Sequence, residues 1–146
     1  MTDAAMNFHV TVGDWDTQQA GAQAVRYEVF IVEQNIPVEL EWDDMDKVCL
    51  HAVVHDKNDA AIGTGRLLPN GYIGRMAVRK SMRRTGIGGA ILAALMQQSK
   101  KRGDKAVMLN AQLHAVPFYT RHGFVPEGEE FPDAGIPHIR MRHVFR

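Results

Sequence analysis

The residue types best suited to bind an anion gather in one short stretch, between Arg79 and Gly89. An apolar run ending in Met-Ala-Val precedes it and predicts a buried strand, while Ile87, Ile91 and Leu95 recur at helical spacing. A strand, a basic turn and a helix in this order offer free backbone N–H groups and a positive helix end to a phosphate. Glycine lets the backbone approach such a ligand closely, because it has no Cβ. The basic and glycine residues of the turn are Arg79, Lys80, Arg83, Arg84, Gly86, Gly88 and Gly89.

The spacing of these glycines excludes two common phosphate-binding motifs. The dinucleotide frame G-x-G-x-x-G would end on Ile91, and a P-loop would need a Lys directly after its last glycine, which none of these glycines has. The stretch from Arg83 to Gly88 matches R/Q-x-x-G-x-G/A instead, and it is entered from the strand that ends in Val78. This pattern resembles the acetyl-CoA pyrophosphate loop of the GNAT N-acetyltransferases.

A second motif, in residues 106–124, is independent of the first. Members of the GNAT family follow their fifth strand with a short helix that carries an aromatic pair and closes as Y-x-x-x-G-F. Phe118-Tyr119 and Gly123-Phe124 match that pattern. The first half of the chain narrows the resemblance, since the segment Arg26 to Pro37, the acidic run after it and His51 look like the ElaA-type branch of the family.

The resemblance implies acetyl-CoA as co-substrate and a set of residues that hold it. The backbone of Met76 and Val78 would bind the pantetheine arm, and main-chain N–H groups of the loop would hold the pyrophosphate. Arg83, Arg84 or Lys80 would add positive charge. The coenzyme A-binding residues implied in this way are Met76, Ala77, Val78, Arg83, Arg84, Thr85, Gly86, Ile87, Gly88, Gly89, Asn110, Phe118, Tyr119 and Arg121.

The implied reaction is direct attack of a primary amine on the thioester carbonyl. Such a reaction needs a neutral amine, a donor to the oxyanion and a proton for the leaving thiolate. By this resemblance, the N–H of Val78 would be the oxyanion donor and Tyr119 would be the general acid. A phenol with an ordinary pKa of about 10 is protonated at neutral pH and can give up its proton in the reaction.

The general base stays open at this point. Some GNAT enzymes carry a glutamate on the fourth strand, but the residues Tyr72 to Met76 offer no carboxylate. Glu33, His51 and members of the acidic segment Glu39 to Asp46 are the candidates, and a reaction without a base is also open. Because His51 alternates with apolar neighbours, an exposed or satisfied histidine of the sheet is the more natural interpretation.

A non-catalytic acyl-CoA sensor on the same fold is the alternative function. The missing fourth-strand glutamate favours it, whereas the retained Tyr119 argues against it. A nucleotide-binding protein that uses the loop for ATP or NAD is a third interpretation, with less support from the spacing.

Composition limits the partners and the compartment. The 146 residues include 17 basic and 17 acidic side chains, a balance that argues against nucleic acid or an anionic membrane as the main partner. The charges are segregated, however, with acidic residues in 39–46 and basic ones in 79–84, which favours a small cationic amine as acceptor.

The single Cys49 excludes an internal disulfide, and we expect a cytoplasmic location. No Cys/His spacing resembles a zinc site and the histidines are scattered, so no metal is predicted. The resemblance allows a homodimer, although no interface is visible in the sequence.

Hydrophobic periodicity predicts the elements that position these residues. The first helix is expected to start at a capping pair, Asp16 with Gln19, and to bury a stripe of Ala22, Val25, Val29 and Val32, with Arg26 off the stripe or at its edge. Residues 33–47 are expected to form a loop or short helix over a cleft, with carboxylates turned toward solvent or ligand. The remaining expected elements are strands at 7–12, 49–55, 60–68, 73–78, 105–111, 124–125 and 138–145, helices at 87–102 and 117–122, and a flexible acidic loop at 127–137.

The predicted fold class is therefore mixed α/β, as a single GNAT domain over residues 1–146. Three strands in the middle of the chain would form an antiparallel meander. The fifth strand should lie parallel to the fourth, because a helix connects them by a right-handed crossover. The resemblance adds that the central twisted sheet is mostly antiparallel and that this parallel pair splays apart to admit the cofactor.

Overall fold

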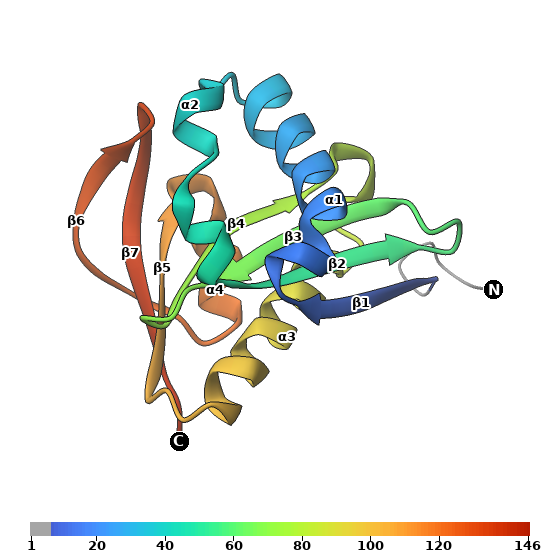
Figure 1. The fold of residues 1–146 in the computed structure, drawn as a ribbon. Helices are drawn as coiled ribbons and strands as arrows, with labels where there is room; N and C mark the ends of the chain where they lie inside the picture. The colour runs from blue at the N-terminus through green and yellow to red at the C-terminus, as the bar shows by residue number, and fades with distance from the viewer. Residues whose placement is uncertain (1–6) are drawn as a thin grey trace.

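One twisted sheet organises residues 7–146, the part of the chain that this computed structural model describes (Figure 1). Its strands lie in the order β1-β2-β3-β4-β5-β7-β6, and among them β4 and β5 form the parallel pair. The fold is therefore the predicted mixed α/β fold with a mostly antiparallel sheet. The strands are β1 (Phe8–Gly13), β2 (Leu50–Asp56), β3 (Ala61–Leu67), β4 (Tyr72–Val78), β5 (Ala106–Gln112), β6 (Val125–Asp133) and β7 (Ile136–Val144).

The two longest helices cover opposite faces of the sheet, as Figure 1 shows. Gly21 of α1 packs against Val53, whereas Gly63 and Gly65 on the other face lie against α3, where a Cβ would come within 3 Å of the Ile91 side chain. No helix within residues 7–146 combines the length and the apolar composition needed to cross a bilayer. The helical segments are α1 (Trp15–Arg26), η2 (Tyr27–Glu33), α2 (Val38–Glu41), η3 (Asp44–Val48), η4 (Lys80–Met82), α3 (Ile87–Lys101), η5 (Leu113–Ala115) and α4 (Val116–Arg121).

The first helix differs from its prediction in its start and in its buried face. Asp14, rather than Asp16, caps it by accepting a hydrogen bond from the Thr17 N–H. From Tyr27 onward the helix continues as the π-helical segment η2, whose wider turns break the 3.6-residue phase on which the predicted stripe rested. Val32 is consequently 59% exposed, and Arg26, expected at the edge of the stripe, is only 1% exposed.

The acidic stretch 127–137 is not a flexible loop. It forms β6 and the start of β7, joined by a tight turn in which Ala134 and Gly135 have positive φ. The Phe131 ring stacks on His138 with their centroids 6.0 Å apart, and Glu127 pairs with Arg140. Because β6 lies at the edge of the sheet, most of its residues are exposed, and its sequence reads as polar rather than as a strand.

Two acidic residues of α2 and η3, Glu41 and Asp46, turn inward into ion pairs, whereas Glu39 and Asp44 are exposed as predicted. Asp46 is buried between two guanidinium groups, 2.9 Å from Arg26 Nη1 and 2.8 Å from Arg66 Nη1. Glu41 is likewise buried, 3.0 Å from Arg26 Nε and 2.9 Å from Arg75 Nε. Charged groups enter a protein interior only when they are paired, and here the partners come from α1, β3 and β4.

Two tryptophans and an exposed carboxylate complete this buried ion network. The Arg26 guanidinium lies 5.7 Å from the centre of the Trp15 ring and 5.0 Å from that of Trp42. Arg66 makes a bidentate pair with Asp43 at 2.8 Å on each side. The pKa of Asp43 is lowered to about 2, first of all by the hydrogen bonds from Arg66. The network fixes α2 and η3 to the sheet beside β4.

Replacing Asp46 with Asn should destabilise the fold strongly, because Arg26 and Arg66 would be left buried with insufficient negative charge. Removing one partner of a buried pair costs about 3–5 kcal/mol. The measurement is the free energy of unfolding from urea titration at neutral pH. Asp44→Asn is the matched control, since Asp44 is exposed in the same segment and should change stability by only about 0.5 kcal/mol. An equal decrease in the free energy of unfolding in the two variants would show that the buried ion pairs of Asp46 do not contribute more to stability than an exposed carboxylate does.

Candidate functional site

A cavity of about 1370 Å³ opens where β4 and β5 separate. The two strands are paired only at Tyr72 with Met108 and at Ile73 with Leu109, and beyond this point they diverge. The β3–β4 register shifts between Thr64 and Arg66, and Arg75 opposite takes a φ of 49°. This bulge bends β4 away from its parallel neighbour. The splay expected between the fourth and fifth strands is therefore present.

The diverging end of β4 turns backbone groups toward the cavity. The Arg79 N–H donates to the Ile62 carbonyl of β3 at 3.0 Å. Because successive N–H groups alternate sides along an antiparallel strand, the N–H of Val78 points away from β3, to the side from which β5 has departed. The Val78 carbonyl on that side accepts a hydrogen bond from Arg83 Nε at 2.9 Å. By this alternation Val78 has a backbone donor available on the cavity side.

The N-terminus of α3 forms the anion-binding end of the same cavity. Gly86 precedes the helix with a φ of 88°, and no side chain caps it. The N–H groups of Ile87, Gly88 and Gly89 in the first turn therefore lack a partner within the helix. Together with the positive end of the helix dipole, they make this end of the cavity suited to an anion. A Cβ on Gly86 would meet no atom within 4 Å, so its requirement for glycine comes from the backbone conformation.

The next two glycines have a further reason for their small size. A Cβ at Gly88 would lie 3.3 Å from the Phe118 ring, and one at Gly89 would lie 3.1 Å from His122 Nε2. The close neighbour of these residues is therefore α4. Their small size lets α4 pack against the start of α3, which brings the aromatic pair of α4 to the cavity wall.

Arg83 of the basic turn already has an acidic partner. Its guanidinium makes two hydrogen bonds of 2.6 Å to the carboxylate of Glu33. These bonds lower the pKa of Glu33 and raise that of Arg83. Glu33 is thus a weaker base than an ordinary glutamate. The positive charge of Arg83 is partly neutralised by the Glu33 carboxylate. Arg84, which also lines the cavity, has no such pairing among the described residues.

Tyr119 lies on α4 with its ring buried against the core. Its ring meets Phe118 edge-on at 5.0 Å and Phe124 at 6.0 Å, while the residue still forms part of the cavity wall. Burial raises the pKa of Tyr119 to about 12, because the ionised phenolate loses its hydration. The phenol is therefore protonated at any physiological pH.

Most of the residues predicted from the sequence converge on this cavity. Thr85 and Ile87 do not line it: the Thr85 hydroxyl donates to the Met82 carbonyl, and Ile87 belongs to the core, although its backbone N–H remains at the helix end. The predicted residues that do line it are Glu33, Met76, Ala77, Val78, Arg83, Arg84, Gly86, Gly88, Gly89, Asn110, Phe118, Tyr119 and Arg121.

His51 does not belong to the site, which corrects its inclusion as a candidate base. It is buried in the ion network, with Nε2 2.9 Å from the Asp46 carbonyl and its ring 4.7 Å from that of Trp15. Burial lowers its pKa, and it is absent from the cavity wall. The alternation of His51 with apolar neighbours reflected a satisfied histidine of the sheet.

The β6–β7 hairpin contributes two side chains that the sequence did not place in the site. His138 lines the cavity, and its Nδ1 lies 2.6 Å from the Ile136 carbonyl. A carbonyl can only accept, so Nδ1 carries the proton and Nε2 of the neutral ring is left as a base. Asp133 at the other end of the turn also lines the cavity and makes no ion pair within residues 7–146. The interpretation of 127–137 as a loop concealed the position of Asp133, whereas His138 was assigned to the last strand but given no role in the site.

Comparison with known proteins gives a consistent result. A model of the acetyltransferase (GNAT) domain matches residues 10–145. YjcF of Bacillus subtilis, an uncharacterised N-acetyltransferase, is 43% identical over 130 residues, which cover 86% of this chain and 92% of YjcF. The Escherichia coli protein ElaA is 33% identical over 125 residues, 80% of this chain and 81% of ElaA, and its crystal structure superposes with a TM-score of 0.82 over 93% and 99% of the two chains.

A second solved structure supports the same grouping. The crystal structure of an acyl-CoA N-acyltransferase from Pseudomonas aeruginosa superposes with a TM-score of 0.83 at 29% identity, covering 94% of this chain and 99% of the other. The similarity therefore extends over almost the whole fold.

Proposed function

The chain belongs to the GNAT acetyltransferase family, in its ElaA-like branch, and on this premise we propose that it transfers an acetyl group from acetyl-CoA to a primary amine of a small cationic substrate. The family supports acyl transfer from an acyl-CoA in general. The observation that carries the proposal is that one cavity joins a protonated, buried Tyr119 to the uncapped N-terminus of α3.

Coenzyme A fits the residues present in the cavity. The first-turn N–H groups of α3 and the side chain of Arg84 would hold its pyrophosphate. The free edges of β4 and β5 would satisfy the amide groups of its pantetheine arm, and Asn110 of β5 adds an exposed side chain there. Acetyl-CoA, when bound, supplies the activated thioester carbonyl. Arg83 would exchange part of its pairing with Glu33 for the phosphate charge.

Val78 and Tyr119 take the two electrostatic roles of acyl transfer. The N–H of Val78, turned to the open side of β4, would donate to the carbonyl oxygen as negative charge develops on it. Tyr119 would give its proton to the departing sulfur. A phenol with a pKa of about 12 is a weak acid. The same dry surroundings raise the pKa of a thiol, however, so the two pKa values stay close enough for proton transfer.

For the acceptor amine we propose His138 as general base, in place of the candidates considered from the sequence. Its Nδ1–H is held by the Ile136 carbonyl, which leaves Nε2 to remove a proton from an ammonium group. Glu33 and Glu41, which also line the cavity, are both tied up in pairs with arginine.

Asp133 supports the cationic character of the acceptor more directly than the acidic segment does. The carboxylates of Glu41, Asp43 and Asp46 are neutralised by arginines, whereas Asp133 lines the cavity without an ion partner within residues 7–146. An unpaired carboxylate at the mouth of a cavity attracts a positively charged amine. The free, buried Cys49 is compatible with the cytoplasmic location that we also propose.

The proposal is tested by thiol release from acetyl-CoA with a panel of polyamines, aminoglycosides, peptides and neutral amines. The wild-type chain should turn over a cationic amine, and Tyr119→Phe should lower kcat on the order of 10²-fold with a smaller change in KM, since the proton is needed only in the transition state. Tyr27→Phe is the matched control, because Tyr27 is 53% exposed and outside the cavity wall. Tight coenzyme A binding with no turnover of any amine would favour the acyl-CoA sensor instead.

His138→Gln should reduce the rate with an alkylamine acceptor by on the order of 10²-fold near neutral pH, because most of such an amine arrives protonated. With an acceptor whose own pKa lies well below 6, no base is needed and the variant should approach the wild-type rate. The pH profile of kcat/KM with both acceptors measures the difference. His114→Gln, an exposed histidine of the same cavity wall, serves as control. An equal loss with both acceptors would assign His138 a structural role.

A further inference from the structure

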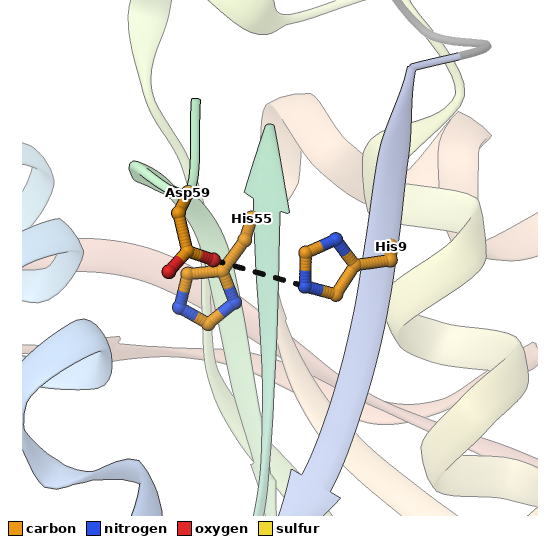
Figure 2. A group of neighbouring side chains, drawn as sticks. All are labelled: His9, His55 and Asp59. Carbon is orange, nitrogen blue, oxygen red and sulfur yellow. Dashed lines mark ion pairs between the residues drawn. The ribbon is translucent and has the colours of Figure 1, made fainter. Parts of the chain in front are cut away.

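We propose that His9, His55 and Asp59 form a binding site for a divalent transition metal of the zinc class, at the edge of the sheet away from the cavity. Figure 2 shows the three side chains turned toward one another from three segments: β1, β2 and the turn that joins β2 to β3. None of the three lines the acyl-transfer cavity. The site is therefore a separate feature and does not rest on the proposed activity.

Strand register brings the two histidines together. His9 of β1 is directly opposite His55 of β2 in the antiparallel pair, so both side chains lie on the same face of the sheet. Their rings stack with centroids 5.4 Å apart and planes 20° from parallel. Asp59 lies beside them because the polypeptide turns back after β2. Asp59 itself has a left-handed backbone conformation in this turn, with a φ of 65°. One Asp59 carboxylate oxygen lies 4.0 Å from His9 Nε2.

The orientation of the His55 ring gives an independent indication of a ligand. Its Nδ1 is buried from solvent and has no hydrogen-bond partner. Its Nε2 faces α1, since a Cβ built on Gly21 would lie 3.6 Å from it. A buried ring nitrogen without a partner costs free energy that a metal bond would offset. Figure 2 shows a nitrogen of this ring directed toward the His9 ring.

The distances suit a zinc ion after a small closure. The candidate ligand atoms all lie within 4.8 Å of one another. A tetrahedral zinc ion with bonds of about 2.0–2.1 Å places its ligands roughly 3.3 Å apart, so each pair of atoms must approach by at most roughly 1.5 Å. The side chains of His9 and Asp59 are 58% and 85% exposed, so they are free to rotate into place.

The donor set selects the class of metal. Two imidazoles and one carboxylate suit zinc and its neighbours in the transition series, whereas magnesium and calcium prefer oxygen ligands alone. Water would fill the remaining position. His9 is far in sequence from His55 and Asp59, so their spacing gave no zinc motif and the sequence analysis predicted no metal.

The expected consequence is stabilisation of an edge of the fold. A metal ion held by these three side chains would tie β1, the end strand of the sheet, to β2 and to the β2–β3 turn. Because the unfolded chain does not assemble the three ligands, binding adds to the stability of the folded state.

The test uses the full chain without a polyhistidine tag. Calorimetry measures its zinc binding, and thermal unfolding with and without zinc chloride measures the change in Tm. We expect one zinc per chain and a rise in Tm on the order of 5 °C at a 100-fold excess over Kd. His9→Ala and Asp59→Asn, both at exposed side chains, should each weaken binding at least about 10-fold and abolish the Tm rise. His55→Ala should do the same.

Controls separate this cluster from adventitious binding to other histidines. His114→Ala should bind zinc as the wild type does, and magnesium chloride should leave Tm unchanged. Zinc binding that survives His9→Ala and Asp59→Asn at the wild-type affinity would overturn the proposal, as would a wild-type chain that binds no zinc.

Discussion

The early end of the β4–β5 pairing is the constraint on which the site depends. Two residue pairs hold the parallel strands together, and the bulge at Arg75 then directs β4 away from β5. Backbone N–H and C=O groups exposed in this way need partners, and the opening supplies them to a ligand rather than to a neighbouring strand. The cavity and the free backbone edge at Val78 both follow from that separation.

Keeping the sheet open at this point requires support from its surroundings. The buried ion network joins α1, α2, η3, β3 and β4 through Arg26, Arg66 and Arg75, and three of its members, Glu41, Arg66 and Arg75, also line the cavity. Paired buried charges add less to stability than apolar packing would, but they allow only one arrangement of the groups. The network therefore fixes the wall at which an acceptor would enter. Packing of α4 on the glycines of α3 fixes the opposite wall.

The anion cradle and the aromatic helix were predictable from sequence because both are local. Gly86, Arg83 and the Phe118-Tyr119 pair lie within short segments whose spacing alone indicates the structure. The proposed general base and the buried pairing of the acidic segment were not predictable, since both depend on contacts between distant segments. Asp46 meets Arg26 and Arg66 only in the folded chain, and His138 reaches the cavity because β7 pairs with β5, which places it opposite Gln112. A polar edge strand and a π-helical turn also have no distinct sequence period to reveal them.

Calorimetric titration with coenzyme A, ATP and NAD in parallel tests the central claim most directly, because all three offer a pyrophosphate or triphosphate to the N-terminus of α3. A cavity built on the separation of β4 from β5 should bind coenzyme A at one site per chain and much more tightly than the other two, since only coenzyme A carries a pantetheine arm for the free strand edges. Equal affinity for ATP or NAD, or no binding of coenzyme A, would contradict the assignment of this cavity to acyl-CoA.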